Sequence, residues 1–291
     1  MKKSLLQRIA LCTLFAAVAQ FPAASGFHAS FVGSTSEHHA RISSASALFM
    51  VQNRGLEVRR DGATPSEGGM SLYLKAGPDG TSVGDCPFAH FVRMVLEEKG
   101  LEYDLLPSVQ ETKPRWLVDH YEGKMPALRH RKECYVESSV IAEYLDFFFR
   151  EPELKGSTAD MEAAEAAIDG IFPAIAKYLK HTPDGDDDDL ALKAGLEEKL
   201  TGLETHLSSA GRTGPFLVGN GDKMTLIDCS LAPKLYHMET GLEGFKNKSI
   251  DLQQQFPKVR AYMDAVFARP SFEATVYPTE TVLWGWGNAR S

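Results

Sequence analysis

The sequence predicts a mixed α/β domain followed by an all-helical domain, and three observations lead to this fold class. The chain has 291 residues, more than one small domain needs. Between residues 70 and 149, alternating apolar runs typical of strands are interspersed with runs of helical period. Beyond Pro152 only helical patterns remain. We therefore expect an α/β domain at residues 69–151 and a helical domain at residues 152–291, behind an N-terminal leader.

The composition is that of a globular protein with a sizeable core. Hydrophobic residues make up 43% of the chain and charged residues 24%. The formal net charge is −8, and so acidic a body repels the phosphates of nucleic acids and anionic lipids. We therefore expect no nucleic-acid partner.

Residues 1–26 have the pattern of a secretory signal peptide. A basic start precedes an apolar run from Ile9 to Val18, and small residues at Ala24 and Gly26 suit a cleavage site. The apolar run is well short of the roughly 20 residues that cross a bilayer, so we expect no stable membrane span.

Residues 27–68 are expected to form a transit-like, disordered leader. This segment starts at Phe27 and is Ser-rich and acid-poor as far as Met50, as transit peptides are. A signal peptide followed by Phe and such a stretch resembles the two-part plastid leaders of algae with secondary plastids. The leader therefore predicts a plastid location, with secretion or the endoplasmic reticulum as the alternative.

The α/β domain starts at Met70–Lys75, whose alternating pattern predicts a strand. A helix is predicted from Cys86 to Gly100, because apolar residues recur every three or four positions and glycine ends the pattern. The remaining elements follow as a strand at 102–106, a short helix at 114–121, a hairpin at 127–130 and 134–136, and a helix at 138–149. The order β-α-β-α-β-β-α is that of a thioredoxin-like domain.

The second domain is predicted from four runs of helical period, at residues 158–180, 190–207, 225–238 and 256–269. Thr225 and Asp228 have the spacing of a capping box and are assigned to helix initiation. The acidic run Asp184–Asp189 is expected to be a solvated loop, because it lacks the alternating ligands and the closing glutamate of a calcium loop. We expect no metal site.

The four cysteines of the chain do not suggest a disulfide framework. Cys12 lies in the leader, and Cys86, Cys134 and Cys229 are an odd number without paired spacing, which favours a reducing compartment. Cys134 falls in a predicted strand and Cys229 in a predicted helix beside apolar residues. Both are therefore expected to pack in the core.

Cys86 is the candidate nucleophile. It lies at the first turn of a predicted helix, where the partial positive charge and free N–H groups favour thiolate over thiol. Pro87 suits the first helical position, because its missing N–H costs nothing there. Ala89 occupies the place of the resolving cysteine in a Cys-x-x-Cys motif. A mixed disulfide at Cys86 must therefore be resolved by an external thiol, and glutathione fits.

Three further features suit a glutathione site. Met125–Pro126 is a candidate cis-proline pair, whose backbone can bind an extended peptide. Glu137 and Ser138 open a helix, where the hydroxyl and free N–H groups can take the γ-glutamyl carboxylate while Glu137 attracts the ammonium group. Lys75 and Lys113 can meet carboxylates, although a lone lysine is more often solvated surface.

Five motifs occur together in order: Gly84-Asp-Cys-Pro-Phe88, Lys113-Pro-x-Trp116, Gly123-Lys-Met-Pro126, Glu137-Ser138 and Ser230-Leu-Ala-Pro-Lys-Leu-Tyr-His237. Over about residues 71–286 the chain thereby resembles the plant-type dehydroascorbate reductases of the glutathione transferase (GST) superfamily. The resemblance implies the GST fold, a thioredoxin-like domain followed by a helical one. It also implies glutathione as co-substrate, dehydroascorbate as substrate, no metal, and a monomer.

The same resemblance assigns site residues. Its catalytic positions fall on Cys86 and Asp85, and its glutathione contacts fall on Lys75, Lys113, Met125, Pro126, Glu137 and Ser138. Three positions depart from the family pattern, which has Val at Met125, Ser at Ala89 and Asp at Glu137. The hydroxyl missing at Ala89 leaves the pKa of Cys86 open.

The mechanism implied by the resemblance has two stages. The Cys86 thiolate attacks dehydroascorbate and ascorbate leaves; the oxidised Cys86 is then captured by one glutathione and released by a second. Two roles for Asp85 stay open, proton transfer to the leaving enediol and capping of the helix. Its carboxylate would also tend to raise the pKa of the thiol.

Two alternative functions share the motif at Cys86. An omega-type GST would use the same cysteine as a thioltransferase on disulfides. A chloride-intracellular-channel-like protein would insert the first helix into a membrane, but Arg93, Glu97 and Glu98 in that helix oppose insertion. Trp284 and Trp286 are expected to pack in the core, with a place at the substrate site as the alternative.

Overall fold

The computed structural model describes residues 69–183 and 186–290. The predicted signal peptide at 1–26 and the transit-like leader at 27–68 lie outside the described residues.

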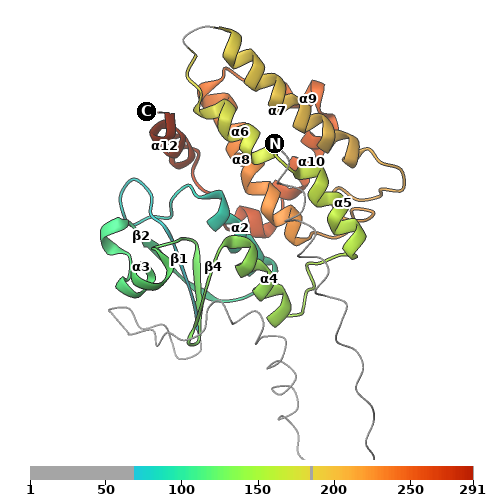
Figure 1. Ribbon diagram of the computed structural model, residues 1–291. Coiled ribbons are helices and arrows are strands. Elements are labelled where there is room, and N and C mark those ends of the chain that lie inside the picture. Colours follow the sequence, from blue (N-terminus) through green and yellow to red (C-terminus); the bar gives the residue numbers. More distant parts are fainter. Residues whose placement is uncertain (1–68, 184–185, 291) are drawn as a thin grey trace, which may run out of the picture. The chain divides into compact units, whose positions relative to one another are not determined.

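The α/β part contains a four-stranded mixed sheet (Figure 1). Its strands are β1 (Met70–Lys75), β2 (Tyr103–Ser108), β3 (Ala127–His130) and β4 (Glu133–Val136), in the order β2-β1-β3-β4. β1 pairs parallel with β2 and antiparallel with β3, and β3 pairs antiparallel with β4. β1 is thus central, and every residue of it except Lys75 is buried.

Alternation along β1 distributes the helices over the two faces of the sheet. The helices are α2 (Pro87–Glu98), α3 (Arg115–Tyr121), preceded by the 3₁₀ turn η1 (Gln110–Thr112), and α4 (Ser138–Phe148). Leu72 and Leu74 belong to the core cluster formed with α2 and α4, whereas Tyr73 packs with Trp116 of α3 in a second cluster. The predicted α/β order is confirmed.

The rest of the described chain is helical, as predicted (Figure 1). Its helices are α5 (Thr158–Ile168), α6 (Ile171–Lys180), α7 (Asp186–Leu207), α8 (Leu226–Phe245), α9 (Leu252–Gln255), α10 (Pro257–Phe267), α11 (Pro270–Glu273) and α12 (Thr279–Arg290).

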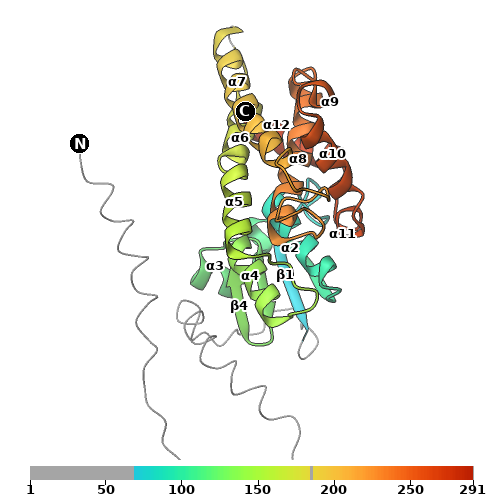
Figure 2. The same ribbon diagram turned by 90° about the vertical axis from the view of Figure 1, so that its right-hand side faces the viewer.

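The single helix predicted at 158–180 is wrong, because the structure has two. The chain leaves the helical conformation at Asp169 and Gly170, where Gly170 has φ +76°. α5 and α6 nevertheless lie one above the other in a single column (Figure 2). α12 was not predicted, and its Gly285 and Gly287 are weak helix formers.

The acidic run at Asp184–Asp189 is not simply a loop. α7 begins at Asp186, and Asp189 accepts a hydrogen bond from Lys246 of the segment after α8 and lies 3.0 Å from His181 Nδ1. These partners hold the pKa of Asp189 below its ordinary value, against the effect of burial. The loop prediction therefore fails at 186–189, where tertiary contacts stabilise a helix start.

Two structural predictions in the helical part are confirmed. The Thr225 N–H and hydroxyl donate to Asp228 over 2.8 and 2.7 Å, forming the capping box that starts α8. Cys134 and Cys229 are buried, with 1% and 0% of their surface exposed.

Polar residues of α2 join the sheet part to the helical part. α2 packs along α8. His90 Nε2 lies 3.0 Å from the Thr275 hydroxyl, and Arg93 donates to the Thr275 carbonyl over 2.8 Å. Glu98 accepts from Arg269 over 2.7 Å. In the described residues, no helix is both long and apolar enough to cross a membrane.

Candidate active site

Cys86 is held at the start of α2. It is the N-cap residue, with φ −70° and ψ 113°, and Pro87 takes the first helical position as predicted. Its carbonyl accepts a 2.7 Å hydrogen bond from the Tyr277 hydroxyl and further bonds from the N–H groups of Ala89 and His90. The cysteine is therefore fixed by its own helix and by the C-terminal segment together.

The surroundings of the Cys86 thiol shift its pKa in opposite directions. Burial raises the pKa of Cys86 above its ordinary value, and the charge of Asp85 raises it further. The backbone N–H groups of Ala89 and Phe88 and the charge of Lys75 act to lower this pKa. The helix-start effect that the sequence predicts is present, but burial outweighs it, and the pKa of Cys86, which the sequence left open, lies above its ordinary value.

Asp85 is paired with a lysine. Its Oδ1 accepts a 2.7 Å hydrogen bond from Nζ of Lys75, the last residue of β1. The N-cap residue of α2 is Cys86, whose side chain makes no capping hydrogen bond, and the carboxylate of Asp85 is engaged by Lys75. Asp85, Lys75 and Cys86 come together because β1 and the start of α2 meet at the same end of the sheet.

α12 packs against the Lys75–Asp85 pair. A Cβ atom at Gly285 would collide with the Asp85 carboxylate, so only glycine allows the helix to approach this closely. The Trp284 ring lies 5.0 Å from Lys75 Nζ, at the site. Trp286 is buried with its ring centroid 6.0 Å from that of His237, which confirms core packing for this tryptophan. The charge of Asp85 acts on His237, but burial dominates and lowers its pKa to about 4.

Four of the predicted glutathione contacts line one pocket of about 480 Å³. These are Met125, Pro126, Glu137 and Ser138, and the Met125–Pro126 peptide is cis, as predicted. Lys124, Phe88 and Lys234 also line it. We call this cavity the basic pocket, because its two lysines outnumber its single acid.

Glu137 has an unusual backbone at the edge of the basic pocket. It is the N-cap of α4 with φ +68°, a region in which a residue with a side chain is strained. Such strain is retained mainly where ligands bind. Its carboxylate lies 3.5 Å from Lys124 Nζ. The α4 N–H groups therefore remain available to an anion, since no side chain caps them.

Lys75 and Lys113 are the two predicted contacts that the structure does not bring to this pocket. Neither is among the residues lining the cavity. Lys75 is paired with Asp85 beside Cys86, and the Nζ of Lys113 lies 3.3 Å from the position that a Cβ at Gly123 would take, at the loop after α3.

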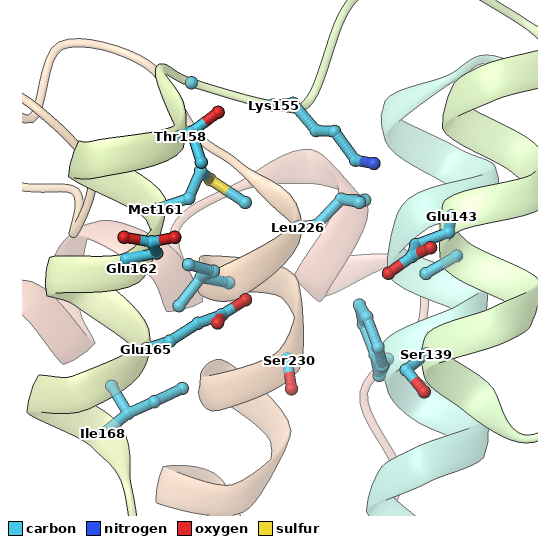
Figure 3. Close-up of a pocket in the computed structure, with 14 residues that line it drawn as sticks. Ser139, Glu143, Lys155, Thr158, Met161, Glu162, Glu165, Ile168, Leu226 and Ser230 are labelled. Atoms are coloured by element: carbon cyan, nitrogen blue, oxygen red, sulfur yellow. The ribbon is translucent and has the colours of Figure 1, made fainter. Parts of the chain in front are cut away.

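Figure 3 shows a second cleft, of about 400 Å³. Both cavities are lined by Phe91, Ser139 and Ser230. The carboxylates of Glu143, from α4, and Glu165, from α5, point into this cleft from opposite sides, and Glu162 and Lys155 also line it. We call it the acidic cleft. Ser139 and Ser230 therefore separate the acidic cleft, which repels anionic groups, from the basic pocket, which attracts them.

Sequence reasoning assigned no role to Lys124, Lys234, Tyr277 or Gly285. Lys124 and Lys234 lie within the Gly123 and Ser230 motifs, so a signal for them existed. Tyr277 and Gly285 act through contacts with Cys86 and Asp85 from a distant part of the chain, and no local pattern marks them. Among the described residues, no cluster of three or more His, Cys, Asp or Glu could hold a metal ion.

Comparisons with known proteins agree with this architecture. Residues 85–146 match the model of the glutathione S-transferase N-terminal domain and residues 158–265 that of the C-terminal domain. Glutathione S-transferase DHAR2 of Arabidopsis thaliana is 38% identical over 205 residues, which cover 70% of this chain and 90% of that protein. Chloride intracellular channel protein 3 of Homo sapiens is 28% identical over 74% of this chain and 94% of its own length.

A solved structure gives the same assignment. The crystal structure of Chlamydomonas reinhardtii dehydroascorbate reductase has a TM-score of 0.64 and 30% sequence identity, and it matches 77% of this chain and 100% of its own. The α/β sheet with a single cysteine at the start of α2, the helical part behind it and these relatives all lead to one family. The chain belongs to the glutathione S-transferases, in the group of the plant DHAR proteins.

Proposed function

We propose that this protein reduces dehydroascorbate to ascorbate, with glutathione as the reductant and Cys86 as the nucleophile. The observation that carries the proposal is the position of Cys86, at the start of α2 beside the Lys75–Asp85 pair. The likeness to the Chlamydomonas dehydroascorbate reductase and to DHAR2 supports the substrate.

The remaining described cysteines support resolution by an external thiol. Cys134 and Cys229 are buried, and burial raises the pKa of Cys134 to about 12 and that of Cys229 well above its ordinary value. Neither can readily form a thiolate that attacks a disulfide at Cys86. Glutathione bound in the basic pocket supplies that thiol.

The proposed reaction has three steps. The Cys86 thiolate gives two electrons to dehydroascorbate, which leaves as ascorbate after taking up protons, while Cys86 gains an oxygen from water as a sulfenic acid. One glutathione condenses with it, releasing water and forming a mixed disulfide. A second glutathione attacks this disulfide, releasing glutathione disulfide and the Cys86 thiolate.

The Lys75–Asp85 pair is suited to the first step. Asp85 is adjacent to the nucleophile in sequence and 2.7 Å from the Lys75 ammonium. A carboxylate in this position can take the thiol proton and pass it to the leaving enediolate, while Lys75 stabilises the negative charge that develops there. Because burial raises the pKa of Cys86, the rate of the first step should increase with pH above neutrality.

The test is glutathione-dependent ascorbate formation by the wild-type chain and by Cys86→Ser, with hydroxyethyl disulfide as a competing substrate. We expect rapid ascorbate formation that the substitution abolishes. Cys134→Ser is the matched control and should retain activity. Strong disulfide turnover with little ascorbate would instead assign the chain as an omega-type thioltransferase, and no Cys86-dependent activity on either substrate would refute an enzymatic role.

We also propose that residues 1–68 direct the protein to a plastid. The signal-like start and the acid-poor, Ser-rich stretch after Phe27 support this destination. Residues 1–68 fused to a fluorescent protein should accumulate in the plastid of an alga with secondary plastids. A secreted fusion would support the alternative.

A further inference from the structure

Lys234 of α8 brings a positive charge from the helical part into the basic pocket. Its side chain lines that pocket together with Phe88 of α2 and Ser138 of α4. The ammonium group lies 5.9 Å from the centroid of the Phe88 ring. Lys234 therefore faces the wall that holds the start of α4 and the Met125–Pro126 backbone.

This charge has no anionic partner among residues 69–183 and 186–290. The Lys234 ammonium donates one 2.9 Å hydrogen bond, to the Ser230 hydroxyl, which is neutral. Lys124, the other lysine of the pocket, is by contrast within 3.5 Å of a Glu137 carboxylate oxygen. Burial lowers the pKa of Lys234 to about 8, so the ammonium is still charged at neutral pH. An unpaired, partly desolvated charge is unfavourable until an anion reaches it.

The surroundings restrict where such an anion can lie. The start of α4 offers uncapped N–H groups and the positive end of the helix dipole. The acidic cleft beyond Ser139 and Ser230 repels anions. An anion in the basic pocket is thus attracted to the space between Lys234 and Ser138.

The chemistry of the two proposed substrates selects the anion. Dehydroascorbate carries no net charge, whereas glutathione carries two carboxylates, and its γ-glutamyl carboxylate is the one suited to a helix start. We propose that Lys234 is a glutathione-binding residue, whose ammonium group pairs with the γ-glutamyl α-carboxylate opposite the start of α4. The inference rests on the proposed function only in taking glutathione as the co-substrate.

The test measures glutathione binding by calorimetry in the full chain carrying Cys86→Ser, so that no turnover is needed. Lys234→Met should weaken binding about tenfold or more, as expected for a lost charge-assisted pair. Lys234→Arg should recover most of the affinity. Lys193→Met is the matched control, because Lys193 pairs with Glu197 along α7, and it should leave binding unchanged.

A ligand without the carboxylate identifies the contact. 4-Aminobutyryl-cysteinyl-glycine lacks only the γ-glutamyl α-carboxylate, and we expect Lys234→Met to change its affinity less than twofold. Equal losses for this analogue and for glutathione, or no loss for either, would overturn the proposal. Ascorbate binding that depends on Lys234 while glutathione binding does not would assign the residue to the product enediolate and also overturn it.

Two readouts separate this inference from its alternatives. A higher melting temperature for Lys234→Met excludes misfolding as the cause of lost binding. Because binding is measured without dehydroascorbate, a chain that makes no ascorbate but still binds glutathione through Lys234 refutes the proposed function and leaves this inference intact.

Discussion

Lys75, beside Cys86, and Lys234, in the basic pocket, come from two parts of the chain, and they differ in what neutralises their charge. Lys75 ends β1, with 48% of its side chain exposed, and it is paired with Asp85. Lys234 is half-buried in the basic pocket, and within the described part of the chain its ammonium donates to a neutral hydroxyl and has no anionic partner. The pKa of Cys86 is shifted by Asp85 and Lys75. We therefore propose that Lys75 acts on the reacting sulfur and that Lys234 acts in ligand binding.

The largest expected effect concerns Asp85, the partner of Lys75. Asp85→Asn should lower kcat about a hundredfold, because the proton acceptor next to Cys86 is lost. The same substitution should lower the pKa of Cys86, since the Asp85 charge raises it. Steady-state kinetics and the pH profile of Cys86 alkylation, followed on its peptide by mass spectrometry, measure both.

The proton-transfer role and the charge of Asp85 predict opposite changes in kcat for Asp85→Asn. If Asp85 acted only through its charge, the more acidic thiol would react faster near neutrality and kcat would rise. A rise in kcat would therefore contradict the proton-transfer role.

The next largest effect is on the stability of the fold and concerns Lys234. In the folded chain the pKa of Lys234 is lowered to about 8, whereas in the unfolded chain a lysine titrates near its ordinary value of about 10.4. Between these values the unfolded state binds more protons, so stability rises with pH. Below pH 8 the full desolvation cost of the buried ammonium is present. Lys234→Met should therefore increase the free energy of unfolding at pH 7 by about 2 kcal/mol.

Urea denaturation at several pH values checks this prediction. The difference between Lys234→Met and wild type should shrink as pH rises from 8 towards 10. Lys193→Met should show no such trend. A destabilised Lys234→Met protein would mean that the lysine is needed for packing.

A smaller effect separates the two lysines directly. Lys75→Met should slow alkylation of Cys86 at pH 7 about tenfold, because the Lys75 charge lowers the pKa of the thiol. Lys234→Met should change this rate less than twofold. If both substitutions slowed alkylation equally, Lys75 and Lys234 would not have different roles at Cys86.

The sequence predicted the α/β order well because strand and helix periods are local properties. The alternation at Met70–Lys75 and the helix after Cys86 each bury one face, and the structure uses these faces as expected. Interruptions set by tertiary contacts were missed. Gly170 breaks a continuous helical period, and α7 starts at Asp186 close to Asp189, whose carboxylate meets Lys246 far along the chain.

The candidate site also has features that local sequence predicts and features that depend on tertiary contacts. Cys86, Met125–Pro126 and the start of α4 could be recognised from short motifs, because caps and turns have local signatures. The net sign of the pKa shift at Cys86 could not, since it depends on how deeply the thiol is buried. Gly285 and Lys234 gain their significance from what they approach, Asp85 and the basic pocket, and only the folded chain reveals it.

The smallest effect tests whether the acidic cleft belongs to the ligand site. Glu143 and Glu165 line it on the far side of Ser139 and Ser230 from Lys234. If the glutathione carboxylate pairs with Lys234, these glutamates act on it only weakly through solvent, and Glu143→Gln and Glu165→Gln should each change the KM for glutathione less than twofold. The sign of any change should be a lower KM, because a repelling charge is removed. A several-fold higher KM would show that the cleft holds the ammonium end of the ligand, and it would place the γ-glutamyl group across both cavities.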